Sequence, residues 1–168
     1  MTADQAKAIL DLMTGTIEQE SVATRKVIAA VPNGNRDYKP DAKSRTAWEI
    51  ATHLAMSDVW FADSILKGSF EWTGDPETPA EMTDPAAVAK WHEKHLGEGL
   101  AKLRRMTPEQ LTKNINFFGT DGPAVTFLAA MNNHMVHHRG QLAAYLRPAG
   151  SKVPAIYGIS ADENLMAG

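Results

Sequence analysis

Four long stretches of this 168-residue chain carry apolar residues at three- and four-residue intervals, and this spacing constrains the fold more than any other feature. The stretches are residues 2–31, 46–68, 84–106 and 123–148. Side chains on an α-helix return to the same direction about every 3.6 residues, so each stretch predicts a helix with one apolar face. We find no convincing strand pattern and no internal repeat. The sequence therefore predicts an all-α four-helix bundle.

Residues with the chemistry of helix starts precede the first three predicted helices. Thr2 with Gln5, and Thr46 with Glu49, have the spacing of a capping box. Asp84 is followed by a proline, the usual pair of an N-cap and a first helical residue. Helix breakers follow the predicted helices, namely Pro32 with Gly34, Gly68, and Pro148.

The segments between the predicted helices carry weaker signals. Residues 69–83 hold glycine and prolines without a sustained period, which predicts a long connection of the kind that often covers a site. Residues 107–110 repeat the capping signal and predict a short helical turn, whereas residues 115–118 fit either a turn or a brief extended piece. Pro123 is expected as the first residue of the fourth helix. Residues 149–168 predict an irregular tail that packs over the bundle.

Composition is that of a single globular domain, which we expect to span residues 1–168. Apolar residues at 43% and charged residues at 22% argue against a disordered or fibrous chain. The net charge of −3 and the lack of a basic block argue against a nucleic-acid partner. Neither a membrane span nor a secretory leader is evident, so we expect a cytoplasmic protein without a membrane partner.

The chain has no cysteine, so disulfides, thiolate ligands and cysteine nucleophiles are all excluded. Any zinc-type site must therefore use His, Asp or Glu.

Three of the six histidines, His134, His137 and His138, fall within five residues of the predicted fourth helix. His134 and His138 are one turn apart and about 40° apart around the axis, so both can reach one ion; His134 and His137, about 60° apart, are also compatible. His53, on the inner strip of the second predicted helix, is the best third ligand. From spacing alone, two roles for these residues are equally supported: metal ligands, or histidines that are hydrogen-bonded in the core. Met135 stands where a zinc-protease helix needs glutamate, which argues against that class.

Residues 134–142 read His-x-x-His-His-Arg-Gly-Gln-Leu, and this run resembles the DinB-like family of four-helix-bundle proteins. Residues 38–40, Tyr-Lys-Pro, and residues 153–158, Val-Pro-Ala-Ile-Tyr-Gly, are also similar to members of that family. The resemblance covers nearly the whole chain. It implies metal ligands at His53, His134 and His138, and a homodimer.

The resemblance also implies a reaction class. Some DinB-like proteins are metal-dependent S-transferases that use low-molecular-weight thiols, and related ones are thiol-dependent isomerases. Three neutral imidazoles leave the charge of a divalent ion uncompensated and a coordination position open, which is typical of catalytic sites. We expect zinc or nickel, because three imidazoles suit either ion and no thiolate is present.

Three functions are compatible with such a site. The first is a transferase that joins a thiol cosubstrate to a small electrophile. The second is a metal-dependent hydrolase, which needs a general base such as Asp58 or Glu49. The third is a non-catalytic, stress-related module in which the ion ties two helices together.

Other polar residues have alternative roles. Arg139 and Gln141 could orient a substrate carboxylate or support the ligands, but hydrogen bonding between helices is the favoured role. His137 is expected to face away from the site. His92 and His95 could form a second metal site, although their charged neighbours favour a solvated face.

The second predicted helix and the loop after it are rich in aromatic side chains. These residues could line a pocket, form a dimer interface or simply pack in the core. They are Trp48, Trp60, Phe61 and Trp72.

Overall fold

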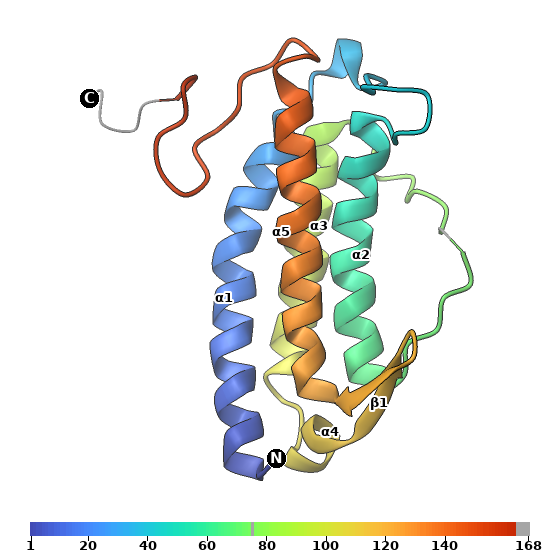
Figure 1. Ribbon diagram of the computed structural model, residues 1–168, viewed down its shortest axis with the longest axis vertical. Helices are drawn as coiled ribbons and strands as arrows, with labels where there is room; N and C mark the ends of the chain where they lie inside the picture. The colour runs from blue at the N-terminus through green and yellow to red at the C-terminus, as the bar shows by residue number, and fades with distance from the viewer. Residues whose placement is uncertain (75, 164–168) are drawn as a thin grey trace.

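Four long helices lie side by side in the computed structural model, which describes residues 1–74 and 76–163 (Figure 1). They are α1 (Ala3–Ala29), α2 (Ala47–Lys67), α3 (Pro85–Leu103) and α5 (Phe127–Leu146). Helices α1 and α2 each pack against both α3 and α5, so the four surround a common core. The predicted all-α four-helix bundle is confirmed.

The expected caps close the first turns of the helices. Thr2 and Gln5 bond each other's backbone N–H groups at the start of α1, and Thr46 and Glu49 do the same for α2. The Asp84 side chain accepts a hydrogen bond from a backbone N–H of the first turn of α3. Each such cap stabilises a helix by about 0.5–2 kcal/mol. Local sequence chemistry therefore sets where the first three long helices begin.

The helix ends differ from expectation by a few residues. Helix α1 ends at Ala29 rather than near Val31, and α3 ends at Leu103 rather than near Met106. The larger difference is at Pro123, which ends a strand and does not begin the fourth helix. The ring of proline fixes φ at a value that suits extended backbone as well as helix. The ψ of 137° at Pro123 belongs to extended backbone. A 3₁₀ turn, η2 (Ala124–Thr126), then leads into α5.

A small cap structure closes one end of the bundle. Helix α4 (Pro108–Thr112) begins at the predicted helical turn, and strands β1 (Asn114–Phe117) and β2 (Thr120–Pro123) form an antiparallel hairpin after it. Residues 115–118 thus take the extended alternative over most of their length. Phe118 and Gly119, both with positive φ, make the two-residue turn. Figure 1 shows this unit beside the lower ends of α2 and α5.

Irregular connections precede and follow α2. A 3₁₀ turn, η1 (Asn33–Asn35), lies between α1 and α2. Among the described residues of the predicted connection 69–83 there is no helix or strand. The described part of the tail, residues 149–163, is also without helix or strand, as predicted.

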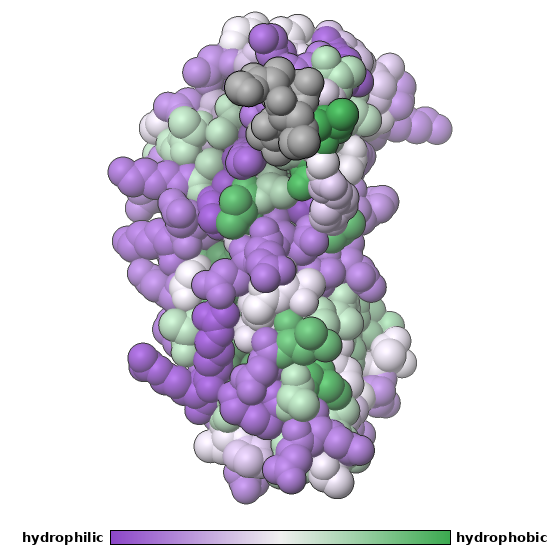
Figure 2. Space-filling view, turned by 90° about the vertical axis from the view of Figure 1, so that its left-hand side faces the viewer, coloured by the Kyte–Doolittle hydropathy of each residue, from purple (hydrophilic) through white to green (hydrophobic). Residues whose placement is uncertain are grey.

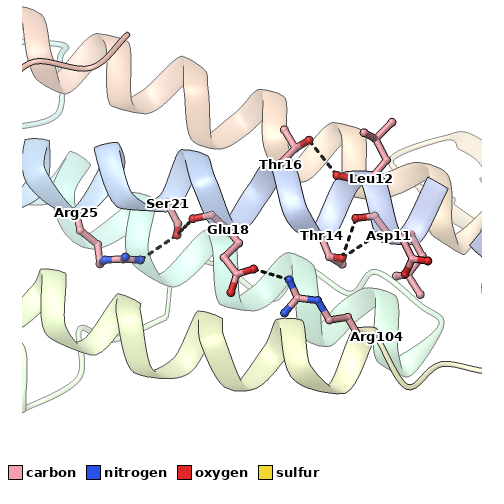
Figure 3. A network of polar contacts seen from close by, with 9 residues as sticks. Asp11, Leu12, Thr14, Thr16, Glu18, Ser21, Arg25 and Arg104 are labelled. Atoms are coloured by element: carbon pink, nitrogen blue, oxygen red, sulfur yellow. Dashed lines mark hydrogen bonds and ion pairs between the residues drawn. The ribbon is translucent and has the colours of Figure 1, made fainter. Parts of the chain in front are cut away.

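The apolar core holds the bundle together, and surface ion pairs add little to it. Figure 3 shows one such pair, in which Arg104, the C-cap residue of α3, contacts Glu18 of α1 at 2.7 Å. Exposed pairs of this kind contribute about 0–1 kcal/mol. Burying one Leu-sized side chain contributes about 1.5–3 kcal/mol. All four long helices supply such side chains, among them Leu10, Ile50, Leu54, Ile65, Leu96, Leu100, Leu128 and Leu142.

The α1 side of the molecule is largely hydrophilic, with separate hydrophobic groups on it (Figure 2). Among the exposed apolar residues of α1 are Leu12 and Val22. In the described part of the chain, no helix has the length and apolar character needed to cross a bilayer.

Candidate metal centre

Three histidines converge between α2 and α5, two helices that pack against each other. His53 comes from α2, and His134 and His138 come from successive turns of α5. One ring nitrogen of each lies within 4.8 Å of the others. The ring centroids are 4.4 Å apart for His134 and His138, 4.8 Å for His53 and His138, and 5.2 Å for His53 and His134. The structure therefore brings together the three residues that the sequence singled out.

The structure also decides which pair on α5 joins His53. His134 and His138 share the face toward α2, whereas His137 is exposed and lies outside the cluster. The His137 ring still touches His138, with centroids 4.9 Å apart. This agrees with the expectation that His137 faces away.

Burial favours the neutral form of the His134 and His138 imidazoles. Together with the neighbouring His138 and His53, it lowers the pKa of His134 to about 3. Burial also lowers the pKa of His138, with His137 and Arg45 acting in the same direction. A metal binds only the unprotonated nitrogen of imidazole. Both side chains can therefore offer a nitrogen lone pair to a metal ion at neutral pH.

Gln141 fixes the orientation of the His138 ring. Its Oε1 lies 3.0 Å from Nδ1 of His138, so an N–H at Nδ1 donates to the amide oxygen. This leaves the lone pair of Nε2 of His138 free to bind an ion. Such a partner on the far ring nitrogen commonly orients a metal-binding histidine.

The donor set fits a divalent transition metal. Three imidazole nitrogens within 4.8 Å of one another can reach one ion at about 2.0–2.1 Å after small rotations of the rings. Nδ1 of His134 is buried and has no hydrogen-bond partner among the described residues. A buried polar atom without a partner is costly, so a ligand that bonds this ring would relieve that cost. The role of the three histidines as ligands stays a prediction.

A cavity of about 370 Å³ opens beside His53. One wall comes from α2, and the other comes from the connection between α2 and α3, which the sequence identified as a possible cover. The lining residues are Arg45, Glu49, Thr52, His53, Met56, Ser57, Trp60, Glu71, Trp72, Thr73, Gly74, Pro76 and Thr78. His53 is the member of the histidine cluster that lines this cavity.

The two candidate general bases are poorly placed for that role. Asp58 is fully buried and bonds His92 at 2.9 Å, and burial raises its pKa. Asp58 is not among the residues that line the cavity. Glu49 lines it, but its Oε2 accepts a hydrogen bond from the Thr46 N–H at 2.7 Å. That bond lowers the pKa of Glu49 and holds its carboxylate at the helix cap.

The prediction that His92 lies on a solvated face is wrong. His92 is fully buried in the interior beside Asp58, because it follows Val88 by one turn and precedes Leu96 by one turn on the apolar face of α3. His95 instead stacks on Trp91, with ring centroids 4.1 Å apart.

Arg139 connects helices, as the favoured interpretation expected. Its guanidinium is buried, contacts the Glu20 carboxylate of α1 at 2.6 Å and donates to the Glu20 carbonyl at 3.1 Å. It also bonds the hydroxyl of Tyr157, which in turn donates to Glu20 at 2.8 Å. Arg139 therefore ties α5 to α1 and to the tail.

Sequence reasoning missed Ser57. Its Oγ lies 3.3 Å from Nδ1 of His53, and it also lines the cavity. The signal was available, because Ser57 follows His53 by one helical turn.

We expect Gln141→Leu to weaken zinc binding by about 10–100-fold, because the His138 ring loses the acceptor that orients it. The unfolding free energy should change little. Competition with a chromophoric chelator measures the affinity, and urea denaturation measures the stability. Asn133→Ala, an exposed change on the same helix, is the matched control. Equal zinc affinity in Gln141→Leu and wild type would contradict this role.

Comparison with known proteins matches residues 5–164 to the model of the DinB family. Bacillus subtilis protein YrdA is 25% identical over 154 residues, which cover 92% of this chain and 91% of that protein. Bacillus subtilis YjoA is 28% identical over 130 residues, which cover 76% of this chain and 82% of that protein. Both are described as uncharacterized proteins.

Two crystal structures of DinB-like proteins are similar to this fold. That of YjoA from Bacillus subtilis superposes with a TM-score of 0.69 at 25% identity and covers 86% of this chain and 97% of its own. That of a protein from Bacillus cereus ATCC 10987 gives a TM-score of 0.71 at 23% identity, covering 86% and 95%. The second likeness supports the fold alone.

Proposed function

This chain belongs to the DinB family, and we propose that it holds one divalent metal ion with His53, His134 and His138 to join a low-molecular-weight thiol to a small electrophile. The observation that carries the proposal is the convergence of three imidazoles from two helices beside a cavity. The thiol and the transfer reaction come from the family resemblance.

The residues of the site have separate roles in this reaction. The three imidazoles are neutral donors without a carboxylate among them, so they leave the charge of the ion uncompensated and positions on it open. A divalent ion held there favours the thiolate form of a bound thiol at neutral pH. Gln141 holds the ring of His138, and the cavity walls hold the electrophile near the cluster. In the transfer, sulfur bonds to carbon, the leaving group departs with its electron pair and the thiol proton passes to solvent.

We propose zinc or nickel as the ion, since a set of three imidazoles suits either. Four-coordinate geometry would favour zinc, and six-coordinate geometry would favour nickel. Calcium or magnesium would contradict the proposed ligand set, because both prefer oxygen ligands.

The two alternatives have less support. A hydrolase needs a base at the cluster, and neither Asp58 nor Glu49 is placed to supply one. A non-catalytic module would bind the ion without turnover, which the experiment below distinguishes. A homodimer, a cytoplasmic location and one domain over residues 1–168 stay predictions.

We expect protein purified without a nickel column to contain about one zinc or nickel ion per chain by elemental analysis. This metal-loaded protein should accelerate the reaction of cysteine with iodoacetamide, measured by iodide release. A chelator should abolish the acceleration, and the missing ion should restore it. His137→Ala, a change outside the cluster, is the control and should retain activity. Bound metal without acceleration would favour the non-catalytic module.

A further inference from the structure

Two tryptophans form a corner of the cavity beside His53. Trp60 of α2 and Trp72 of the following connection lie with ring centroids 5.5 Å apart and planes at 86°. Nε1 of Trp60 donates to the carbonyl of Glu71 at 3.2 Å, which fastens the connection to α2 next to Trp72. Phe70 packs against Trp60 with centroids 5.4 Å apart and supports the corner. The corner thus presents two perpendicular indole rings.

The tryptophans are only partly covered by the protein. Trp72 is 45% exposed, although it lies in the cavity wall and contacts Trp60. Aromatic rings favour edge-to-face and offset contacts with further rings, and exposed indole surface gains most from a flat apolar partner. An aromatic group that enters the corner would meet one indole by its face and the other by its edge.

Most polar groups of the cavity wall already have partners in the protein. The hydroxyl of Thr52 donates to the carbonyl of Trp48 at 3.1 Å. Glu49 is held at the helix cap, and Glu71 contacts Lys67 at 2.9 Å. Arg45 and these two carboxylates give the wall charges of both signs. The wall therefore favours an uncharged ligand over an ionic one.

The cavity also has the size and the position of a substrate site. Its volume of about 370 Å³ lies in the usual range for sites that take small molecules. His53 belongs both to its wall and to the histidine cluster. A ligand whose aromatic body rests on the two tryptophans would hold its substituent against His53.

We infer that the electrophile of this site is an uncharged aromatic molecule, which packs its ring into the corner formed by Trp60 and Trp72 and presents its reactive substituent toward His53. The inference rests on the proposed function and names the substrate class of the same site. It does not require the thiol to be identified.

The test measures the binding of naphthylmethanol to the full chain by calorimetry, with and without zinc. We expect Trp72→Ala to weaken binding by about tenfold, because it removes one wall of the corner, and Trp72→Phe to retain most of the affinity. Trp91→Ala is the control, because Trp91 stacks on His95 of α3 and does not line the cavity. Decahydronaphthylmethanol, which has the same skeleton without aromaticity, and the anion naphthoate should both bind more weakly.

The outcomes separate this inference from the proposed function. Equal binding to Trp72→Ala and wild type, or tighter binding of either comparison compound, would overturn the inference. Zinc binding without naphthylmethanol binding would overturn the inference and leave the metal site standing. Naphthylmethanol binding that depends on Trp72, in a chain that binds no metal, would support the aromatic site and overturn the proposed function.

Discussion

Replacing His92 by alanine is expected to lower the free energy of unfolding by about 3–5 kcal/mol, one of the largest effects of any single change in this chain. The His92 and Asp58 side chains are fully buried and bond each other at 2.9 Å. Without the imidazole, the Asp58 carboxyl stays in the interior with no hydrogen-bond partner at Oδ2. Urea denaturation followed by circular dichroism measures the loss.

Two further variants test the cause. His95→Ala, three residues along the same helix, removes a half-buried ring and should cost much less. Replacing Asp58 and His92 together by leucine should cost less than His92→Ala, because a buried polar pair is often replaced by apolar side chains at little cost. A loss below about 1 kcal/mol for His92→Ala would contradict the importance of the pair.

The helices were predictable because their signals are local. The capping boxes at Thr2 and Thr46 need only residues three positions apart, and the structure forms both. The spacing of His134 and His138 likewise places them on one face of a helix without knowledge of the fold. The choice of His53 as the third member depends on which face of α2 meets α5. That contact is set by the packing of all four helices, which residue spacing does not reveal. The choice of His53 therefore rested on its place on the inner strip of the predicted helix and on the family resemblance.

The hairpin was not predictable by the same means. Its strands have only four residues each, too few for an alternating pattern to stand out. Its turn places Phe118 at a positive φ of 46°, where asparagine or glycine is the usual residue. Pro123 adds to the ambiguity, because its fixed φ suits a strand end and a helix start alike.

His92 shows how charged neighbours can mislead. Lys94 and Glu98 lie on the exposed side of α3 and suggested that His92 was solvated as well. The stronger signal was its distance of one turn from both Val88 and Leu96, which places the three on one buried stripe. Its partner Asp58 belongs to another helix, 34 residues away in sequence, so no local pattern could reveal the pair.

His138→Ala is expected to abolish stoichiometric metal binding and to leave the bundle folded. Two imidazoles hold a divalent ion far less tightly than three. We expect the affinity for zinc to fall by more than about 100-fold, a larger loss than the one expected from Gln141→Leu, which removes only the hydrogen-bond partner of a ligand. The fold should persist because His138 is only half-buried, and because each buried Leu-sized side chain of the core contributes about 1.5–3 kcal/mol. Elemental analysis and circular dichroism on the same samples measure both effects.

The control for this change is His137→Ala, which removes the adjacent imidazole outside the cluster and should retain the metal. Wild-type protein treated with a chelator should keep its helical signal, because an open site with three ligands stabilises a large bundle less than its core does. Small domains built around structural zinc behave in the opposite way and unfold without the ion. Loss of most helical signal at room temperature, in His138→Ala or in chelated wild type, would therefore reject a catalytic centre and indicate an ion that staples α2 to α5.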